Sequence, residues 1–318
     1  MVNTNKTNKM NVILSLIIPI YNEKEVLPFL ANALQKVAAK LPKETELLLI
    51  DDGSTDETAS EIKKIQWPFP TTLIEFSRNF GHQSALLAGL QAAKGIAVVT
   101  LDADLQHPPA IIPELFSLYE KGYDVVLTQR NDLTERVSFG KRITSQFFYY
   151  LINAISNTKV PTNTSDFRLL SRQALTALLE MPEQRKFLRG MVNWIGFKSI
   201  IVPFDVENRI AGKSKYSLSK MLQLAFHGVT SFSIMPLYFS GIFSLFLFSL
   251  AFMYAVYVLY VFFIAQTTVS GWASLLIINL VIGGFMSLFL GLIGVYLAAI
   301  YEEVKRRPAY ILKKTQNL

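Results

Sequence analysis

The sequence contains no cysteine, and this absence removes several classes of chemistry at once. Without thiols there is no disulfide, no thiolate metal site and no cysteine nucleophile. Histidine is scarce: His82, His107 and His227 are the three present, and their spacing does not match a metal cluster, so we expect loop or interface positions for them. Charge is missing from one long stretch, because no Asp, Glu, Lys or Arg occurs between Met221 and Tyr301. The chain is therefore predicted to combine a soluble domain with a membrane domain.

The uncharged stretch holds two apolar segments, 235–265 and 272–301, each longer than the ~20 residues that cross a bilayer. A buried pair of core helices is the alternative. The link 266–271 is short and uncharged, whereas basic residues precede the first segment and follow the second. By the positive-inside rule, we expect a multi-pass inner-membrane protein whose termini and soluble domain are cytoplasmic. The flanking basic residues are Lys213, Lys215, Lys220, Lys305, Arg306, Arg307, Lys313 and Lys314.

The basic balance of the chain, with a formal net charge of +7, also bears on its partners. Many of the basic residues flank the apolar segments, so an anionic lipid surface is a better predicted partner than nucleic acid. Residues 218–229 carry apolar side chains largely on one side of a helix, which favours a place in the membrane interface. Glycines in the second segment permit close helix packing and hence a homo-oligomer. These glycines are Gly283, Gly284, Gly291 and Gly294.

In the soluble domain, short apolar runs alternate with segments of helical periodicity. This alternation predicts an α/β fold with a mostly parallel sheet covered on both faces. Asn22 with Glu25, and Ser54 with Glu57, have the spacing of capping boxes and are expected to open two helices. The predicted strands are 12–18, 46–50, 71–76, 96–101, 124–128 and 198–207. The predicted helices are 26–41, 57–65, 81–93, 109–121 and 187–194.

The strand at 96–101 ends in two carboxylates, Asp102 and Asp104, which can project on one side of an extended segment. Ligands of open α/β sheets bind beyond the carboxyl ends of the strands. Two hard oxygen ligands suit Mg²⁺ or Mn²⁺, which completes its shell with water and substrate phosphates. The alternative is a strand that simply ends in solvated acids.

Five short motifs follow one another along the chain: Pro-Ile-Tyr-Asn-Glu at 19–23, Asp-Asp-Gly-Ser-Thr-Asp at 51–56, Asp-Ala-Asp-Leu-Gln-His-Pro-Pro at 102–109, Asp-Phe-Arg at 166–168 and Arg-Ile-Ala-Gly-Lys-Ser-Lys-Tyr at 209–216. In this order they resemble glycosyltransferase family 2, and more closely the polyisoprenyl-phosphate glycosyltransferases. That group includes dolichyl-phosphate mannose synthase and the GtrB-type bactoprenol glucosyltransferases. The resemblance implies a GT-A domain over 1–216, an interfacial region at 217–234, a two-helix transmembrane domain at 235–301 and a basic cytoplasmic tail at 302–318.

The resemblance also assigns roles to individual residues. A metal on Asp102 and Asp104, with Gln106 at a third metal-side position, would act as a Lewis acid beside the leaving diphosphate. Arg130 would reach the diphosphate or the sugar. The implied nucleotide-sugar contacts are Pro19, Tyr21, Glu23, Ile50, Asp52, Asp102, Ala103, Arg209 and Lys215. Arg136, Lys141 and Arg142 are expected at the acceptor phosphate.

Two of these roles have alternatives. Arg209 and Lys215 would clamp a phosphate, or would belong to a lipid-surface patch. Asp166 would be a general base, or would orient Arg168 or the acceptor. A phosphate nucleophile with a second pKa near ~6 is mostly ionised at neutral pH and needs no base.

The implied reaction is inverting transfer of one sugar, glucose from UDP-glucose, to polyprenyl (undecaprenyl) phosphate. The product would be a lipid-linked sugar for glycan modification. A dolichyl-phosphate-mannose-type synthase that uses GDP-mannose is one alternative. A processive polysaccharide synthase is another, although its Q-x-x-R-W motif is missing around Gln184, Arg185 and Arg189. A non-catalytic membrane scaffold is the third.

Overall fold

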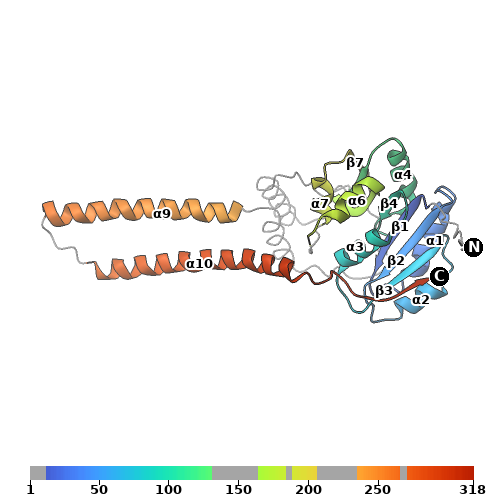
Figure 1. Cartoon of the computed structure of the whole chain (residues 1–318), viewed down its shortest axis with the longest axis horizontal. Coiled ribbons are helices and arrows are strands. Elements are labelled where there is room, and N and C mark those ends of the chain that lie inside the picture. The colour runs from blue at the N-terminus through green and yellow to red at the C-terminus, as the bar shows by residue number, and fades with distance from the viewer. Residues whose placement is uncertain (1–11, 131–163, 184–187, 206–234, 266–270) are drawn as a thin grey trace, which may run out of the picture. The chain divides into compact units, whose positions relative to one another are not determined.

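The computed structural model describes residues 12–130, 164–183, 188–205, 235–265 and 271–318 (Figure 1). The chain divides into two units. The first holds residues 1–149, 158–215 and 307–318, and the second holds 150–157 and 216–306. The predicted interfacial region, 217–234, lies outside the described residues.

An eight-stranded mixed sheet forms the first unit, in the order β7-β5-β6-β4-β1-β2-β3-β8. β1 pairs in parallel with β2 and β4, β2 with β3, and β5 with β7. β6 runs antiparallel between β4 and β5, and β8 runs antiparallel to β3. The mostly parallel α/β sheet that the alternation predicted is thereby confirmed. The strands are β1 Leu14–Ile20, β2 Thr45–Asp51, β3 Thr71–Phe76, β4 Ala97–Thr100, β5 Val125–Arg130, β6 Thr164–Ser171, β7 Ser199–Phe204 and β8 Leu312–Asn317.

Helices cover both faces of this sheet because the central strands are apolar on both sides, as buried parallel strands are. Leu16 of β1 faces the core shared with α1, α2 and α4, whereas Ile17 faces the core shared with α3, α6 and α7. The helices are α1 Leu27–Ala38, α2 Thr58–Lys64, α3 His82–Ala92, the 3₁₀ turn Pro109–Ile111 with α4 Ile112–Glu120, α6 Arg172–Glu180 and α7 Leu188–Trp194.

Both predicted capping boxes were wrong. α1 begins after Val26 and α2 after Glu57, and neither has a side-chain cap. Asn22 instead has a left-handed backbone, with φ of 53°, and its side-chain oxygen accepts a hydrogen bond from the Thr55 amide at 2.9 Å. The Ser54 hydroxyl donates to Asp51 at 2.5 Å and accepts a hydrogen bond from the Asn22 amide at 3.0 Å. The bonds between Asn22, Ser54 and Thr55 join the loop after β1 to the loop after β2, a tertiary contact that the local pattern does not contain.

The resemblance implied a basic cytoplasmic tail at 302–318. In the structure the preceding helix continues to Lys305, and residues 312–317 form β8 at the edge of the sheet. In Figure 1 this red strand lies beside β3. Covering the edge of β3 in this way removes a row of unpaired backbone groups from solvent.

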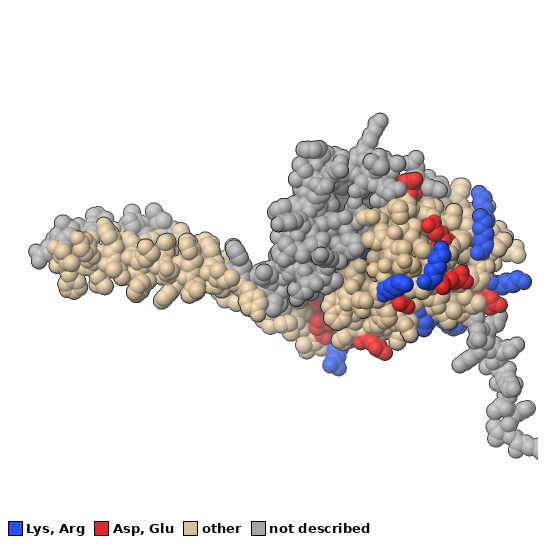
Figure 2. Space-filling view, turned by 90° about the horizontal axis from the view of Figure 1, so that it is seen from above, with Lys and Arg blue, Asp and Glu red and all other residues tan. Residues whose placement is uncertain are grey.

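The second unit contains α9, Met235–Tyr260, which continues as a π-helical turn to Ala265, and α10, Trp272–Lys305. The windows 240–257 and 281–305 are long and apolar enough to cross a membrane. Phe243 of α9 packs on Phe285 of α10 with ring centroids 4.9 Å apart. Figure 2 shows uncharged surface along most of these helices, whereas charged side chains gather over the first unit. An exposed apolar surface of this kind is typical of a membrane-spanning pair.

Candidate active site

The two carboxylates predicted at a strand end lie at the carboxyl edge of the sheet, after β4 in its centre. The amide of Leu101 still bonds to the Ile17 carbonyl at 3.0 Å, and the chain then leaves the sheet. Leu105 is buried in a left-handed conformation, with φ of 59°, which non-glycine residues rarely adopt and which clusters at functional sites. The Gln106 amide donates to Asp104 Oδ1 at 3.1 Å. The turn therefore fixes the Asp104 carboxylate against its own backbone.

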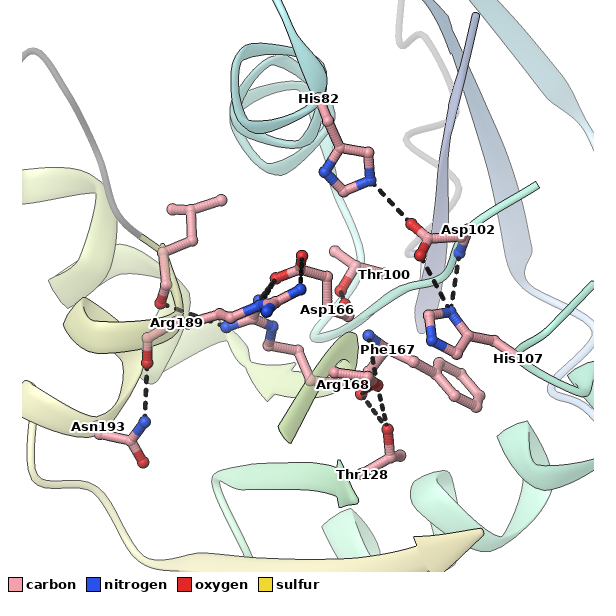
Figure 3. A network of polar contacts seen from close by, with 12 residues as sticks. His82, Thr100, Asp102, His107, Thr128, Asp166, Phe167, Arg168, Arg189 and Asn193 are labelled. Atoms are coloured by element: carbon pink, nitrogen blue, oxygen red, sulfur yellow. Dashed lines mark hydrogen bonds and ion pairs between the residues drawn. The ribbon is translucent and has the colours of Figure 1, made fainter. Parts of the chain in front are cut away.

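Two imidazoles lie against Asp102 (Figure 3). His82 Nε2 lies 2.8 Å from Oδ1 of the carboxylate. His107 Nδ1 accepts a hydrogen bond from the Asp102 backbone amide at 3.4 Å and lies 3.4 Å from Oδ2. Burial opposes ionisation of Asp102, but the hydrogen bond from His82 and the charges of both histidines bring its pKa below the usual value. Burial likewise opposes protonation of His82, yet the Asp102 partner raises its pKa. The sequence placed these histidines in loops or interfaces, and their role at Asp102 was missed.

The donor set fits a divalent cation that also binds substrate. Asp102, Asp104 and Gln106 offer only oxygen ligands from the protein side chains, as Mg²⁺ and Mn²⁺ prefer. Among the described residues, no group of three or more His, Cys, Asp or Glu side chains forms an all-protein metal cage. A cation held by two carboxylates needs further ligands, which water or the phosphates of a substrate can supply.

Asp166 lies on β6, beside β4, where its carbonyl accepts the Thr100 hydroxyl at 2.5 Å. Its side chain is 5% exposed and lies between two guanidinium groups (Figure 3). Arg189 donates through Nε and Nη2 at 3.1 and 2.8 Å, and buried Arg168 donates through Nη2. Burial opposes ionisation, but these arginines hold the Asp166 pKa well below its usual range.

This pairing bears on the two alternatives for Asp166. A carboxylate whose two oxygens are occupied by guanidinium groups, and whose pKa is low, is a weak proton acceptor at neutral pH. The geometry favours the orienting alternative, with Arg189 as a second residue that it orients. Arg189 is the second residue of α7, and the sequence analysis considered it only for the missing Q-x-x-R-W motif. No local signal links it to Asp166, 23 residues away.

A pocket of about 640 Å³ lies beyond the ends of β2 and β3. It is lined by Tyr21, Asp51, Gly53, Ser54, Thr55, Asp56, Glu57, Ala59, Ser60, Lys63, Glu75, Phe76, Ser77, Arg78, Asn79 and Lys313. Of the predicted nucleotide contacts, Tyr21 lies in this lining, and its side chain is exposed. A partly apolar cleft with converging polar groups is the usual form of a ligand site.

Asp51, rather than its predicted neighbour Asp52, lines the pocket. Asp52 accepts hydrogen bonds from the amides of Phe80 and Gly81 at 2.7 and 2.9 Å, and from the Asn79 side chain at 3.0 Å. Burial raises its pKa despite those bonds. Asp52 therefore clamps the loop between β3 and α3, which forms one wall of the pocket.

Gly53 brings two walls of the pocket together. Its φ is +67°, and a Cβ there would lie 2.3 Å from the backbone carbon of Arg78. No other residue type fits this approach without moving the backbone. The loops after β2 and β3 are therefore held at a fixed separation.

The structure places the remaining predicted residues as follows. Pro19 and Ile50 are buried within β1 and β2, and Ala103 is buried in the turn after β4. The Glu23 amide donates to the Thr58 hydroxyl at 3.1 Å. Arg130 ends β5. Arg136, Lys141, Arg142, Arg209 and Lys215 lie outside the described residues.

Comparison with known proteins identifies the fold and the family. A model of glycosyl transferase family 2 matches residues 15–179, which hold both the carboxylate turn and most of the pocket. The chain belongs to glycosyl transferase family 2. The family's GT-A fold is also that of glucosyl-3-phosphoglycerate synthase from Mycobacterium tuberculosis, solved with Mn²⁺, uridine diphosphate and phosphoglyceric acid. That structure aligns with a TM-score of 0.50 and 19% identity over 70% of this chain and 78% of its own.

Closer relatives of this family 2 member match nearly its whole length. The SfII prophage-derived bactoprenol glucosyl transferase of Shigella flexneri is 37% identical over 96% of this chain and 98% of its own. The prophage bactoprenol glucosyl transferase homolog of Escherichia coli K12 is 37% identical over 96% and 99%. The uncharacterized glycosyltransferase YkcC of Bacillus subtilis is 37% identical over 96% and 94%. The likeness therefore includes the two apolar helices.

Proposed function

We propose that this protein is a membrane hexosyltransferase that moves one glucose from UDP-glucose to a polyprenyl phosphate, with inversion at the sugar carbon. The observation that carries the proposal is a carboxylate turn after β4 and a nucleotide-sized pocket beyond β2 and β3, at the same edge of the sheet, in a chain that also holds two apolar helices. Relatives named bactoprenol glucosyl transferase, aligned over both parts, support the lipid acceptor.

The nucleotide-sugar donor is expected to lie across the carboxyl edge of the sheet. Its base and ribose occupy the pocket beyond β2 and β3, where Tyr21 offers an aromatic surface and Asp51 a hydrogen-bond acceptor. Its diphosphate lies toward Asp102 and Asp104 at the end of β4. A divalent cation bound by these carboxylates would neutralise the charge that grows on the leaving diphosphate. The imidazole of His82 keeps the Asp102 carboxylate ionised and oriented for this task, and His107 holds the Asp102 backbone amide.

The acceptor phosphate supplies its own nucleophile. One phosphate oxygen forms the new bond to the sugar carbon while the bond from that carbon to the diphosphate breaks, and no proton needs to be removed from an ionised phosphate. Asp166 fixes the guanidinium of Arg189 through its Nε and Nη2 atoms, and the Arg189 side chain is 40% exposed. A positive charge held in this way would stabilise an acceptor phosphate electrostatically.

A lipid acceptor accounts for the apolar helices, since an interfacial helix with a basic patch is sufficient to dock a soluble enzyme. We propose a multi-pass inner-membrane location with the catalytic domain and both termini in the cytoplasm, as the flanking basic residues indicate. The phosphate would then lie at headgroup depth, within reach of cytoplasmic cations.

The test is a transfer assay with the full chain in detergent. Purified protein is incubated with radiolabelled UDP-glucose, Mg²⁺ or Mn²⁺, and undecaprenyl phosphate, and the product is partitioned into organic solvent. We expect label in one lipid-linked monosaccharide. Label in a polymer would support the processive alternative, and transfer from GDP-mannose alone would support the mannose alternative. Label on a soluble sugar, or no transfer at all, would contradict the proposed acceptor or the enzymatic role.

A further inference from the structure

The strand that follows the membrane helices contributes to the donor pocket. Six residues, 306–311, separate the end of α10 from β8. The Ser77 amide bonds to the Ile311 carbonyl at 3.0 Å. Tyr310 stacks on Phe76, with centroids 4.8 Å apart and an interplanar angle of 7°. These contacts fix the start of β8 against the end of β3, where the pocket opens.

The register of β8 singles out one residue. Leu312 pairs with Phe76 and Lys314 pairs with Glu75, so Lys313 is an extra residue between two paired positions. An extra residue of this kind is a β-bulge, which re-aims a side chain and is common beside active sites. Lys313 lies in the pocket lining and Lys314 does not. The side chains of Lys313 and Lys314 are both exposed, so what distinguishes them is their position relative to the pocket and not their burial.

The charge balance of the pocket gives Lys313 a reason to be there. Among the pocket's lysines and arginines, Lys63 is paired with Glu75 at 2.8 Å. Arg78 lies over the Phe80 ring, 4.0 Å from its centroid, and donates to the Asn79 carbonyl. Lys313 has no ion pair or hydrogen bond within the described part of the chain. Its ammonium therefore remains available to a ligand.

The sheet order decides which part of a nucleotide this ammonium meets. β8 is separated from β4 by β1, β2 and β3, so four interstrand spacings of ~4.8 Å place the two strands about 19 Å apart. A diphosphate held at the end of β4 is beyond the reach of a lysine on β8. The nucleotide base, at the opposite end of the nucleotide sugar from the transferred sugar, is the group that would lie nearest to the Lys313 ammonium.

We propose that Lys313 is a donor-binding residue that donates a hydrogen bond to a carbonyl oxygen of the nucleotide base. The inference rests on the proposed function, because it takes a nucleotide sugar as the ligand of the pocket. It makes the segment after the second apolar helix part of the catalytic domain, in function as well as in sheet pairing. Recognition of the nucleotide would thereby depend on β8, a strand that follows the two apolar helices in the chain.

The experiment measures nucleotide affinity in the full chain purified in detergent with Mg²⁺. Lys313→Met keeps the apolar stem and removes the ammonium, and Lys314→Met is the matched control one residue away. UDP, UMP and uridine are titrated by calorimetry, with displacement of UDP for the weaker ligands. We expect Lys313→Met to raise all three dissociation constants by a similar factor of about ten, the effect of one hydrogen bond from a charged donor. Lys314→Met should stay within about twofold of the wild type.

Each other outcome has a definite meaning. Unchanged affinity in Lys313→Met, an equal loss in Lys314→Met, or a loss confined to UDP would overturn the inference. Lys313→Arg keeps the positive charge and so distinguishes a lost hydrogen bond from a disturbed strand. It should recover part of the affinity for UDP. If it does not, and its Tm equals that of the wild type, the proposed hydrogen bond to the base is refuted. A wild-type protein that binds no UDP overturns the donor assignment itself. A wild type that forms lipid-linked product while Lys313→Met binds UDP equally well overturns only the role of Lys313.

Discussion

Replacing Asp166 with asparagine should destabilise the catalytic domain strongly, because it leaves a buried arginine without its counter-charge. Arg168 is 4% exposed and also donates to the Leu188 carbonyl at 3.2 Å. Removing one partner of a buried ion pair costs about 3–5 kcal/mol. A domain of this size loses roughly 2–4 °C of Tm per kcal/mol, so the expected fall is about 6–20 °C.

The assay is thermal unfolding of the full chain in detergent, followed by tryptophan fluorescence. Arg189→Gln is the control, since it leaves the buried pair of Asp166 and Arg168 intact and removes only the half-exposed partner. Its Tm should fall by much less. The double variant Asp166→Asn with Arg168→Gln should recover part of the loss, because no unpaired charge then remains in the interior.

The same variant gives a pH test with a definite sign. Folding lowers the Asp166 pKa. The ionised carboxylate therefore contributes fully to the free energy of unfolding above the pKa of the unfolded chain, near ~3.9, and this contribution is lost only as the pH falls through the lower pKa of the folded protein. The loss of Tm in Asp166→Asn should therefore persist from pH 5 to 8. The Asp166 charge also raises the pKa of His82, so the Tm difference should be largest at the acidic end of this window, where His82 is protonated. A fall in Tm smaller than about 2 °C within this window would refute the reasoning.

Asp102→Asn and Asp104→Asn should each abolish transfer while the protein stays folded, since both side chains are partly exposed at the edge of the sheet. Full activity of either variant, or of the wild type in chelator, speaks against the metal site. Gly53→Ala should weaken UDP binding at least tenfold and lower the Tm, because its Cβ would lie 2.3 Å from the Arg78 backbone; wild-type affinity measured by calorimetry contradicts the fixed wall. In this cysteine-free chain, Thr268→Cys should react with an impermeant thiol reagent only from the extracytoplasmic face, and reaction only from the cytoplasm contradicts the two-span topology.

The local sequence pattern was sufficient to predict those elements whose structure depends on burial alone. The apolar runs of β1 to β4 predicted buried parallel strands, and the alternation with helices predicted their order along the chain. The end of β4 predicted the position of Asp102 and Asp104 at the sheet edge. The missing charges between 221 and 301 predicted α9 and α10, because a lipid environment demands apolar side chains over a length that the sequence displays directly.

Polar contacts between distant residues could not be predicted in this way. Asp51 and Asp52 are adjacent and chemically identical, yet one lines the pocket and the other clamps a loop, because successive side chains of a strand point to opposite sides. His82 meets Asp102 only because β3, β2, β1 and β4 bring their ends to one edge. The two failed capping boxes have the same cause: the side chains of Asn22 and Ser54 accept hydrogen bonds from backbone amides of each other's loops.

By itself, the sequence determined the alternating α/β domain, the strand-end carboxylates and the two apolar helices, since each follows from periodicity or composition within a short window. Only the tertiary structure decided that Asp166 is held between Arg168 and Arg189 and that 312–317 is a strand of the sheet. Leu-Lys-Lys-Thr-Gln-Asn has no apolar alternation, because an exposed edge strand is held mainly by backbone hydrogen bonds to its neighbour. Backbone bonds of this kind produce no side-chain pattern in the sequence. The position of Lys313 in the pocket lining therefore follows from the pairing of β8 with β3 and could not be predicted.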